Sequence, residues 1–376
     1  MRSPISRRWL MIASSLCALS LVVAACGGSD SNSSSSGSSS SSSSSAKADK
    51  VAVLLPDTKS SVRWETADRP LLQQAFKAAG VPVEIQNAQG DKSTQQQQAE
   101  QAITNGAKVL LLVNLDSGSG AAIEANAKSQ GVKVIDYDRL TLGGSADYYV
   151  SFDNVAVGKL QGQGLVDCLQ KGGGPAKPKI AELNGSPTDN NATLFAQGYN
   201  SVLKPKFDSG DYVKAGDQSV PDWDNQKALT IFEQMLQKES NKIDGVLAAN
   251  DGLGNAAISA IKARKLKQLP VTGQDATAEG IQNILAGDQC MTVYKAIKQE
   301  ADAASKLAIA LSKKQSPAAG LVNGKSDDTK RQVPSVLLKP QAITKDNVNV
   351  VFDDGFLKKS DVCTGKYAQL CTAAGV

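Results

Sequence analysis

The sequence predicts an α/β protein built from two successive parallel sheets with helices on their faces. Short continuous apolar runs recur along the chain, as expected of strands that are buried on both faces of a parallel sheet. Each run is followed by a helical pattern, and this alternation predicts right-handed crossovers between parallel strands. The pattern restarts near residue 150, and the chain beyond residue 49 is long enough for two separate cores.

In the first half, apolar runs alternate with three helical patterns. Gly80 and Gly106 follow the first two patterns and are expected to end those helices, because glycine readily adopts the left-handed conformation found after a helix. The expected strands are 51–55, 83–86, 109–113 and 132–136, and the expected helices are 70–79, 94–105 and 120–129.

A further strand is expected at 148–152, leading away from the first half into the second. The helix expected at 225–239 is typical of the second half, because its apolar residues recur at i, i+3 and i+4 spacing. The other expected helices are 155–169, 192–203, 254–263 and 297–312, and the expected strands are 179–183, 212–215, 245–249, 270–272, 291–294 and 335–338.

The N-terminal residues predict an export signal that does not belong to the folded part of the protein. Arginines precede an apolar run over residues 10–25, which is shorter than the roughly 20 residues of a spanning helix. The run ends in Val-Ala-Ala-Cys-Gly, which resembles the lipobox of bacterial lipoproteins, so we expect a signal peptide over 1–25 and lipidation of Cys26. The alternative is an ordinary signal peptide with Cys26 incidental. Residues 26–49 are nearly all serine and predict a disordered tether.

Composition excludes several classes of function. The chain has no histidine, which excludes Ser-His-Asp and Cys-His catalysis and any histidine-ligated zinc. The formal charge of +4 is carried mostly by the three arginines of the export signal, so nothing favours binding to nucleic acid. We expect no metal and no cofactor.

The cysteines predict disulfides. Four of them lie beyond the signal and the tether, widely spaced and without a Cys-x-x-Cys pair, and an even number in an exported protein favours pairing. Cys363 and Cys371 would close a short loop and are the expected pair. Cys168 and Cys290, both in the second half, are a possible second pair, although the sequence alone leaves the connectivity open.

Polar residues gather directly after the apolar strands in both halves. The ligand groups of an open α/β sheet meet at the carboxyl ends of its strands. The clusters are Asp138-Arg139, Asp189-Asn190-Asn191, Asn250-Asp251, Gln274-Asp275 and Lys295, and Trp64 and Trp223 lie in loops of the same kind. A role as a helix N-cap explains any single Asp or Asn better than a ligand contact does. Their convergence in both halves favours one shared site.

This set of side chains suits a ligand rich in hydroxyl groups. A hydroxyl donates once and accepts up to twice, so carboxylates and amides can take its hydrogen while cationic groups bond its oxygen. Aromatic rings suit the apolar C–H faces of a pyranose. A phosphate would require a glycine-rich turn from strand to helix, which these strand ends do not supply. The sequence therefore predicts a carbohydrate site.

Several motifs, in order along the chain, resemble those of the periplasmic-binding-protein type 1 family of sugar ABC importers, and within it the D-xylose-binding group. They are Arg63-Trp64, Tyr137-Asp138-Arg139, Ser151-Phe152-Asp153-Asn154, the loop 185–191, Asn250-Asp251, Gly273-Gln274-Asp275-Ala276 and the strand 291–295. The resemblance implies two doubly wound parallel-sheet lobes joined by a three-segment hinge. We expect the N-terminal lobe to hold 50–149 and 296–334, and the C-terminal lobe 150–295 and 335–376.

The resemblance also implies the residues that would bind the sugar and the partners of the protein. The expected ligand-binding residues are Arg63, Trp64, Asp138, Arg139, Asn190, Asn191, Trp223, Asn250, Asp275 and Lys295. The two tryptophans would sandwich the ring, and because we expect them to be exposed, their truncation should barely affect stability without ligand. The expected protein is a monomer that is lipid-anchored to the outer face of the cytoplasmic membrane and delivers sugar to an ABC permease.

The same residues are compatible with other ligands and functions, which they support less well. The ligand could be arabinose, ribose, glucose or galactose instead of D-xylose, and a sugar-sensing role is compatible with the same site. An enzyme would use Asp138 and Asp275 as its carboxylate pair, but Arg139 and Lys295 beside them favour ionised acceptors over a proton donor. A sugar-responsive repressor would need an N-terminal helix-turn-helix in place of the signal and tether.

Overall fold

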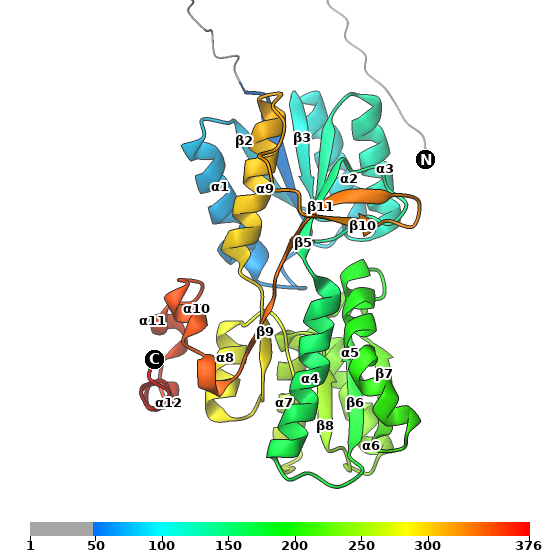
Figure 1. Ribbon diagram of the computed structural model, residues 1–376, viewed down its shortest axis with the longest axis vertical. Coiled ribbons are helices and arrows are strands. Elements are labelled where there is room, and N and C mark those ends of the chain that lie inside the picture. Colours follow the sequence, from blue (N-terminus) through cyan, green and yellow to red (C-terminus); the bar gives the residue numbers. More distant parts are fainter. Residues whose placement is uncertain (1–47) are drawn as a thin grey trace, which may run out of the picture. The chain divides into compact units, whose positions relative to one another are not determined.

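The computed structural model describes residues 48–376 (Figure 1). The expected signal peptide, Cys26 and nearly all of the serine-rich tether therefore lie outside the described residues. Within that described part, helices long and apolar enough to cross a membrane are absent.

The first lobe is built on a seven-stranded sheet with the order β10-β11-β5-β4-β3-β1-β2. Its strands pair in parallel except at the edge, where β10 runs antiparallel to β11. The strands are β1 (Lys50–Leu55), β2 (Val83–Asn87), β3 (Ala107–Leu112), β4 (Lys133–Tyr137), β5 (Tyr148–Phe152), β10 (Gly324–Asp327) and β11 (Gln332–Leu338).

Helices cover both faces of this sheet because its central strands are apolar on both sides (Figure 1). On one face, Val51, Val53 and Leu55 of β1 pack with α1 (Arg69–Ala78) and α9 (Ile297–Ser312). On the other, Ala52 and Leu54 pack with α2 (Lys92–Thr104) and α3 (Ser117–Ser129). A short π-helical turn, η1 (Trp64–Asp68), leads from the end of β1 into α1.

The second lobe is built on the parallel sheet β7-β6-β8, which comprises β6 (Lys179–Asn184), β7 (Val213–Ser219) and β8 (Gly245–Ala248). Four helices pack with it in one core: α4 (Asn154–Lys171), α5 (Asn190–Asp208), α6 (Asn225–Lys238) and α7 (Asp251–Ala263). Helices α4 and α5 approach closely at Gly158 and Gly198, since a Cβ on Gly198 would come within 2.7 Å of the Gly158 Cα. The N-terminus of α5 follows the carboxyl end of β6 in the chain.

The chain passes between the lobes three times. The crossings lie between β5 and α4, between β9 (Thr292–Tyr294) and α9, and between β11 and β12 (Gln341–Ile343), where β12 pairs antiparallel with β9. Residues from α8 (Ala278–Ala286) and the tail helices α10 (Val350–Asp353), α11 (Lys359–Val362) and α12 (Tyr367–Ala373) form a separate small core beside these crossings. The structure contains both Cys168–Cys290 and Cys363–Cys371 disulfides.

Two expected assignments are corrected by the strand pairing. The strand at 148–152 was expected to lead from the first half into the second, and the strand at 335–338 to belong to the second lobe. Instead, β5 pairs with both β4 and β11 in the first sheet. The boundaries expected at residues 149 and 334 therefore fall inside two strands of the first lobe. The strand expected at 270–272 is reduced to a single bridge from Val246 to Val271. The expected α/β class, with parallel sheets and helices on both faces, is confirmed.

Candidate functional site

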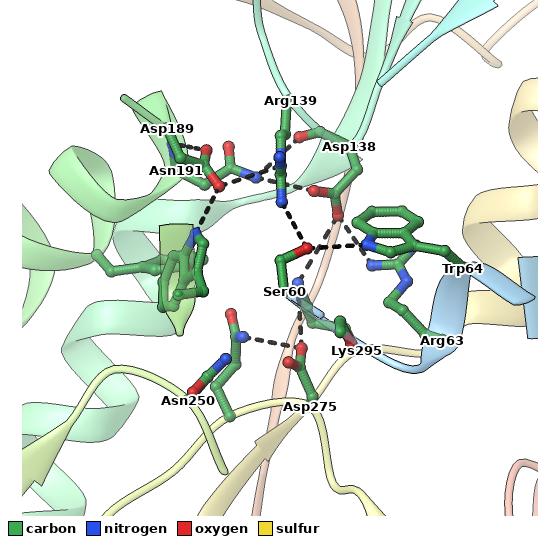
Figure 2. A pocket seen from close by; sticks show the side chains of 14 residues that line it. Ser60, Arg63, Trp64, Asp138, Arg139, Asp189, Asn191, Asn250, Asp275 and Lys295 are labelled. Atoms are coloured by element: carbon green, nitrogen blue, oxygen red, sulfur yellow. Dashed lines mark hydrogen bonds and ion pairs between the residues drawn. The ribbon is translucent and has the colours of Figure 1, made fainter. Parts of the chain in front are cut away.

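One pocket collects polar and aromatic side chains from both lobes, at the carboxyl ends of their strands (Figure 2). It is lined by Ser60, Ser61, Arg63, Trp64, Asp138, Arg139, Asp189, Asn191, Phe195, Trp223, Asn250, Gln274, Asp275 and Lys295. The free volume in the pocket is about 30 Å³, because many of these groups pair with one another across it. That volume admits about two water molecules.

The structure brings together every predicted ligand-binding residue except Asn190. Asn190 opens α5 half-buried, and its neighbour Asn191 is the one that faces the pocket. The sequence reasoning omitted Ser60, Ser61, Asp189, Phe195 and Gln274 from the site. Asp189 and Gln274 stand in the predicted polar clusters and could have been included on that signal, whereas Ser60, Ser61 and Phe195 carry no such signal.

Arg63 is the most constrained side chain of the site. Its Nε and Nη2 each donate to a carboxylate oxygen of Asp68 at 2.8 Å, its Nη1 donates to Asp138 Oδ2 at 2.9 Å, and its Nη2 also donates to Glu300 Oε2 at 2.5 Å. Burial alone would lower the pKa of Arg63, but the charge of Asp68, that of Glu300 once it ionises and that of Asp138 outweigh burial and raise the pKa of Arg63. Arg63 is therefore a fixed cation, held by groups in η1, at the end of β4 and in α9.

Asp138 follows β4 directly in the left-handed backbone conformation, with a φ of 63°. Three side-chain groups hold its carbonyl oxygen: the Tyr149 hydroxyl at 3.0 Å, the Ser151 hydroxyl at 2.9 Å and the Asn191 amide at 3.0 Å. Burial alone would raise the pKa of the Asp138 carboxyl, but Lys295, Arg63 and Arg139 lower it below the ordinary value. Asp138 is thus kept ionised, as a hydrogen-bond acceptor.

Side-chain contacts of Asn191 and Asp189 also join the lobes at this point. Asn191, in the first turn of α5, donates its amide to Asp138 Oδ1 at 3.0 Å. Arg139 Nε lies 3.1 Å from Asp189 Oδ2, while Asp189 Oδ1 caps α5 by accepting from the Asn191 backbone N–H at 2.9 Å. The N-cap explanation considered for Asp189 is therefore correct for one of its oxygens, and the other oxygen faces the opposite lobe.

The remaining polar groups come from the second lobe and the crossing after β9. Asp275 has a φ of 97°, and its Oδ1 accepts from the Gln274 amide at 2.8 Å and lies 3.5 Å from Lys295 Nζ. Lys295 also lies 3.7 Å from Asp138 Oδ2, so it bridges carboxylates of both lobes. Asn250 caps α7 through its side-chain oxygen, which accepts from Leu253 N at 2.9 Å, and it also lines the pocket.

The two tryptophans differ from expectation in their burial. Trp64 is only 2% exposed and Trp223 only 5% exposed, and each belongs to the core of its own lobe as well as lining the pocket. The Arg63 guanidinium lies over the Trp64 ring at 4.5 Å, and Phe195 meets Trp223 edge-on at 6.3 Å between ring centroids. The rings are therefore not exposed as expected. Because each ring also packs in the core of its own lobe, we now expect its truncation to lower stability without ligand.

The arrangement is suited to binding a neutral polar ligand. It offers ionised carboxylates as acceptors, guanidinium, ammonium and amide groups as donors, and two aromatic rings. Among residues 48–376, no group of three or more Cys, Asp or Glu side chains is placed to hold a metal ion.

Comparisons with known proteins point the same way as the geometry. A family model described as a periplasmic binding protein domain matches residues 51–316. The D-xylose-binding periplasmic protein of Escherichia coli (strain K12) is 39% identical, covering 84% of this chain and 93% of that protein. The multiple sugar-binding periplasmic receptor ChvE of Rhizobium radiobacter is 35% identical, covering 84% of this chain and 92% of that protein.

A solved structure extends the similarity to three dimensions. The crystal structure of a carbohydrate transporter solute binding protein from Chloroflexus aurantiacus, in complex with D-glucose, has a TM-score of 0.76 with this chain. The two sequences are 31% identical, and the match covers 83% of this chain and 97% of that one.

The Arg63 cluster predicts a pH dependence of stability. Burial, with the charges of Asp138 and Asp68, raises the pKa of Glu300 to about 8 although Arg63 and Lys295 oppose the shift. A folded-state pKa above the unfolded value means that the folded form keeps a proton that the unfolded form loses. The free energy of unfolding should thus fall as pH rises from about 4.3 to about 8, by up to about 1.4 kcal/mol per pH unit.

Glu300→Gln should flatten this slope, because glutamine is neutral at every pH and still offers an oxygen to Arg63. Chemical denaturation between pH 5 and pH 8 measures it, with Glu279→Gln, at an exposed position on α8, as the matched control. Parallel pH profiles for the wild type and Glu300→Gln would mean that Glu300 is already ionised in the folded protein.

Proposed function

The chain belongs to the family of periplasmic binding protein domains, as its motifs predicted, and we propose that it binds D-xylose for an ABC importer. The observation that carries this proposal is the pocket, in which ionised carboxylates, fixed cations and two tryptophans from both lobes face one another. Each sugar hydroxyl can take one donor and one acceptor from this set. The D-xylose-binding relative supports the choice of sugar.

Binding would exchange the present pairs for bonds to the sugar. Asp138 would release Lys295, and Asp275 would release Gln274, each then accepting from a hydroxyl. The lobes would separate to admit the ligand and close on it by rotation about the three crossings. The closed form would present both lobes together to the permease.

The site binds and does not catalyse in this proposal. Glycoside hydrolysis requires one carboxyl group that stays protonated to act as an acid. Of the two candidate carboxylates, Asp138 has a lowered pKa and lies against Arg63, and Asp275 lies beside Lys295. Neither is placed as a proton donor.

A second candidate ligand is D-glucose. The Chloroflexus aurantiacus structure, which is a complex with D-glucose, resembles this chain in fold and in sequence. Glucose differs from xylose by one hydroxymethyl group, so the two sugars would share most of the contacts listed above.

The proposed function predicts selective stabilisation by a monosaccharide. Thermal unfolding is measured with D-xylose, D-glucose, L-arabinose, D-ribose and D-galactose, followed by calorimetric titration of those that raise the melting temperature. A ligand at a hundredfold excess over its Kd adds about 2.7 kcal/mol to the free energy of unfolding. D-Xylose should give the largest shift. If every sugar leaves the melting temperature unchanged, the proposed function is wrong.

The tryptophans should contribute to both affinity and stability. Trp64→Ala and Trp223→Ala should each weaken D-xylose binding about thirtyfold or more, about 2 kcal/mol, as buried aromatic anchors do. Because both rings are buried, each change should also cost about 3–5 kcal/mol of folding free energy. Calorimetric titration of the folded variants at low temperature measures the first effect, and denaturation without sugar measures the second.

Phe232→Ala is the matched control, since Phe232 is fully buried in the core of the second lobe away from the pocket. It should lose comparable stability while binding xylose as the wild type does. If the Trp64 and Trp223 variants retain wild-type affinity, the rings do not contact the sugar.

The anchoring of the protein is part of the same proposal. Cys26 carries two acyl chains and holds the protein on the outer face of the cytoplasmic membrane, where it works as a monomer with its permease. A single acyl chain binds a membrane only marginally, so stable anchoring needs at least two. Cys26→Ala should therefore release the protein from membranes or leave it unprocessed. Fractionation measures this, and unchanged membrane association would contradict lipidation at Cys26.

A further inference from the structure

A second cavity adjoins the candidate sugar pocket. It has a volume of about 230 Å³ and is also lined from both lobes. Residues that line this outer cavity and not the pocket include Asp57 and Gln89 in the first lobe and Ser186, Thr188, Asp222 and Asp224 in the second. The outer cavity is therefore polar, and its volume exceeds that of the pocket beside it.

Four residues line both cavities and so form the wall between them: Ser60, Arg139, Asp189 and Trp223. They are joined in one chain of polar contacts (Figure 2). Ser60 Oγ accepts from Arg139 Nη2 at 3.1 Å, Arg139 Nε lies 3.1 Å from Asp189 Oδ2, and that oxygen accepts from Trp223 Nε1 at 3.1 Å. Ser60 Oγ also accepts from Trp64 Nε1 at 3.2 Å, so the wall runs from one tryptophan to the other.

Each lobe contributes two of the four wall residues, so the wall forms only when the lobes are in contact. Ser60 and Arg139 follow β1 and β4 of the first lobe, whereas Asp189 and Trp223 follow β6 and β7 of the second. The contact that crosses between them is the Arg139–Asp189 ion pair, and its two side chains are 7% and 5% exposed. Because one oxygen of Asp189 caps α5, the other is held in a fixed direction toward Arg139.

We propose that Asp189 determines specificity by closing this wall, so that the protein accepts a free monosaccharide and rejects the same sugar carrying a substituent that would extend into the outer cavity. This inference rests on the proposed sugar-binding function. A glycosidic substituent that passes the wall must separate Arg139 from Asp189. An ether oxygen and C–H groups cannot replace a buried ion pair, because each charge would lose its partner.

The test needs a variant that removes the contact of Asp189 with Arg139 and keeps the N-cap of α5. Asp189→Ser keeps a capping oxygen, since serine is a good N-cap, but its side chain is too short to reach Arg139. Asp224→Ser is the matched control: Asp224 caps α6 in the same lobe by accepting from Gln226 N and Lys227 N, and it lines only the outer cavity. Asp189→Asn serves if the serine variant fails to fold, because it keeps the shape and removes the charge.

Calorimetric titration measures the affinities for D-xylose, for the methyl α- and β-D-xylopyranosides and for β-1,4-xylobiose. The quantity compared between variants is the affinity for each substituted sugar divided by the affinity for D-xylose. In the wild type and in Asp224→Ser, the substituted sugars should bind at least a hundredfold more weakly than xylose. In Asp189→Ser, the ratio for at least one of them should rise tenfold or more, while binding of xylose itself weakens.

Three results would overturn the inference. One is tight binding of xylobiose and both glycosides by the wild type, and another is an Asp189→Ser variant that loses affinity for every ligand in equal proportion. In both cases xylose still binds, so the proposed function stands. A wild type that binds no sugar in the panel overturns the proposed function, and this inference with it.

Discussion

The buried guanidinium of Arg63 is the interaction on which the rest of the site depends. Removing a cation from water costs several kcal/mol, which only well-placed partners can offset. Asp68 in η1, Asp138 directly after β4 and Glu300 in α9 provide these partners. Helix α9 begins directly after a crossing between the lobes. Arg63 therefore links the segment after β1, the residue after β4 and the hinge. The position of each partner is thereby fixed relative to the others.

Several residues at the site also have a strained backbone. Asp138 and Asp275 are left-handed, with φ values of 63° and 97°, and so are the consecutive residues Asp222 and Trp223, with φ values of 60° and 55°. Such conformations cost about 1–3 kcal/mol each and persist only where the surroundings fix them. Here the Asp138 carbonyl is held by three side chains, and the Trp223 ring packs so closely over Gly185 that a Cβ there would clash with it. The strain aims a carboxylate and an indole into the pocket.

The features that depend on local sequence patterns were predicted correctly, whereas those that depend on pairing between distant segments were missed. Apolar runs located the central strands, and polar clusters after them located Asp138, Arg139 and Asn191. The expected lobe boundaries fell inside strands β5 and β11, because the parallel pairing of these strands joins segments far apart in the chain, which no local pattern reveals. The burial of Trp64 and Trp223 was missed for a related reason: a loop residue can pack on a core formed by other segments. Asp189 was visible as a cap, but a cap accounts for only one of its two oxygens.

The hydrogen bonds that the pocket side chains make with one another affect which sugars can bind. Asp138, Asp275 and Asp189 already accept from Arg63, Gln274 and Trp223, so a ligand exchanges hydrogen bonds and does not simply add them. An exchange contributes little net free energy when every bond is replaced, but a buried group left without a partner costs about 1–3 kcal/mol. A sugar with one hydroxyl misplaced would leave such a group behind. Discrimination between stereoisomers then arises from the cost of the bonds that the wrong sugar fails to restore, whereas the apolar faces of the two tryptophans attract both isomers similarly.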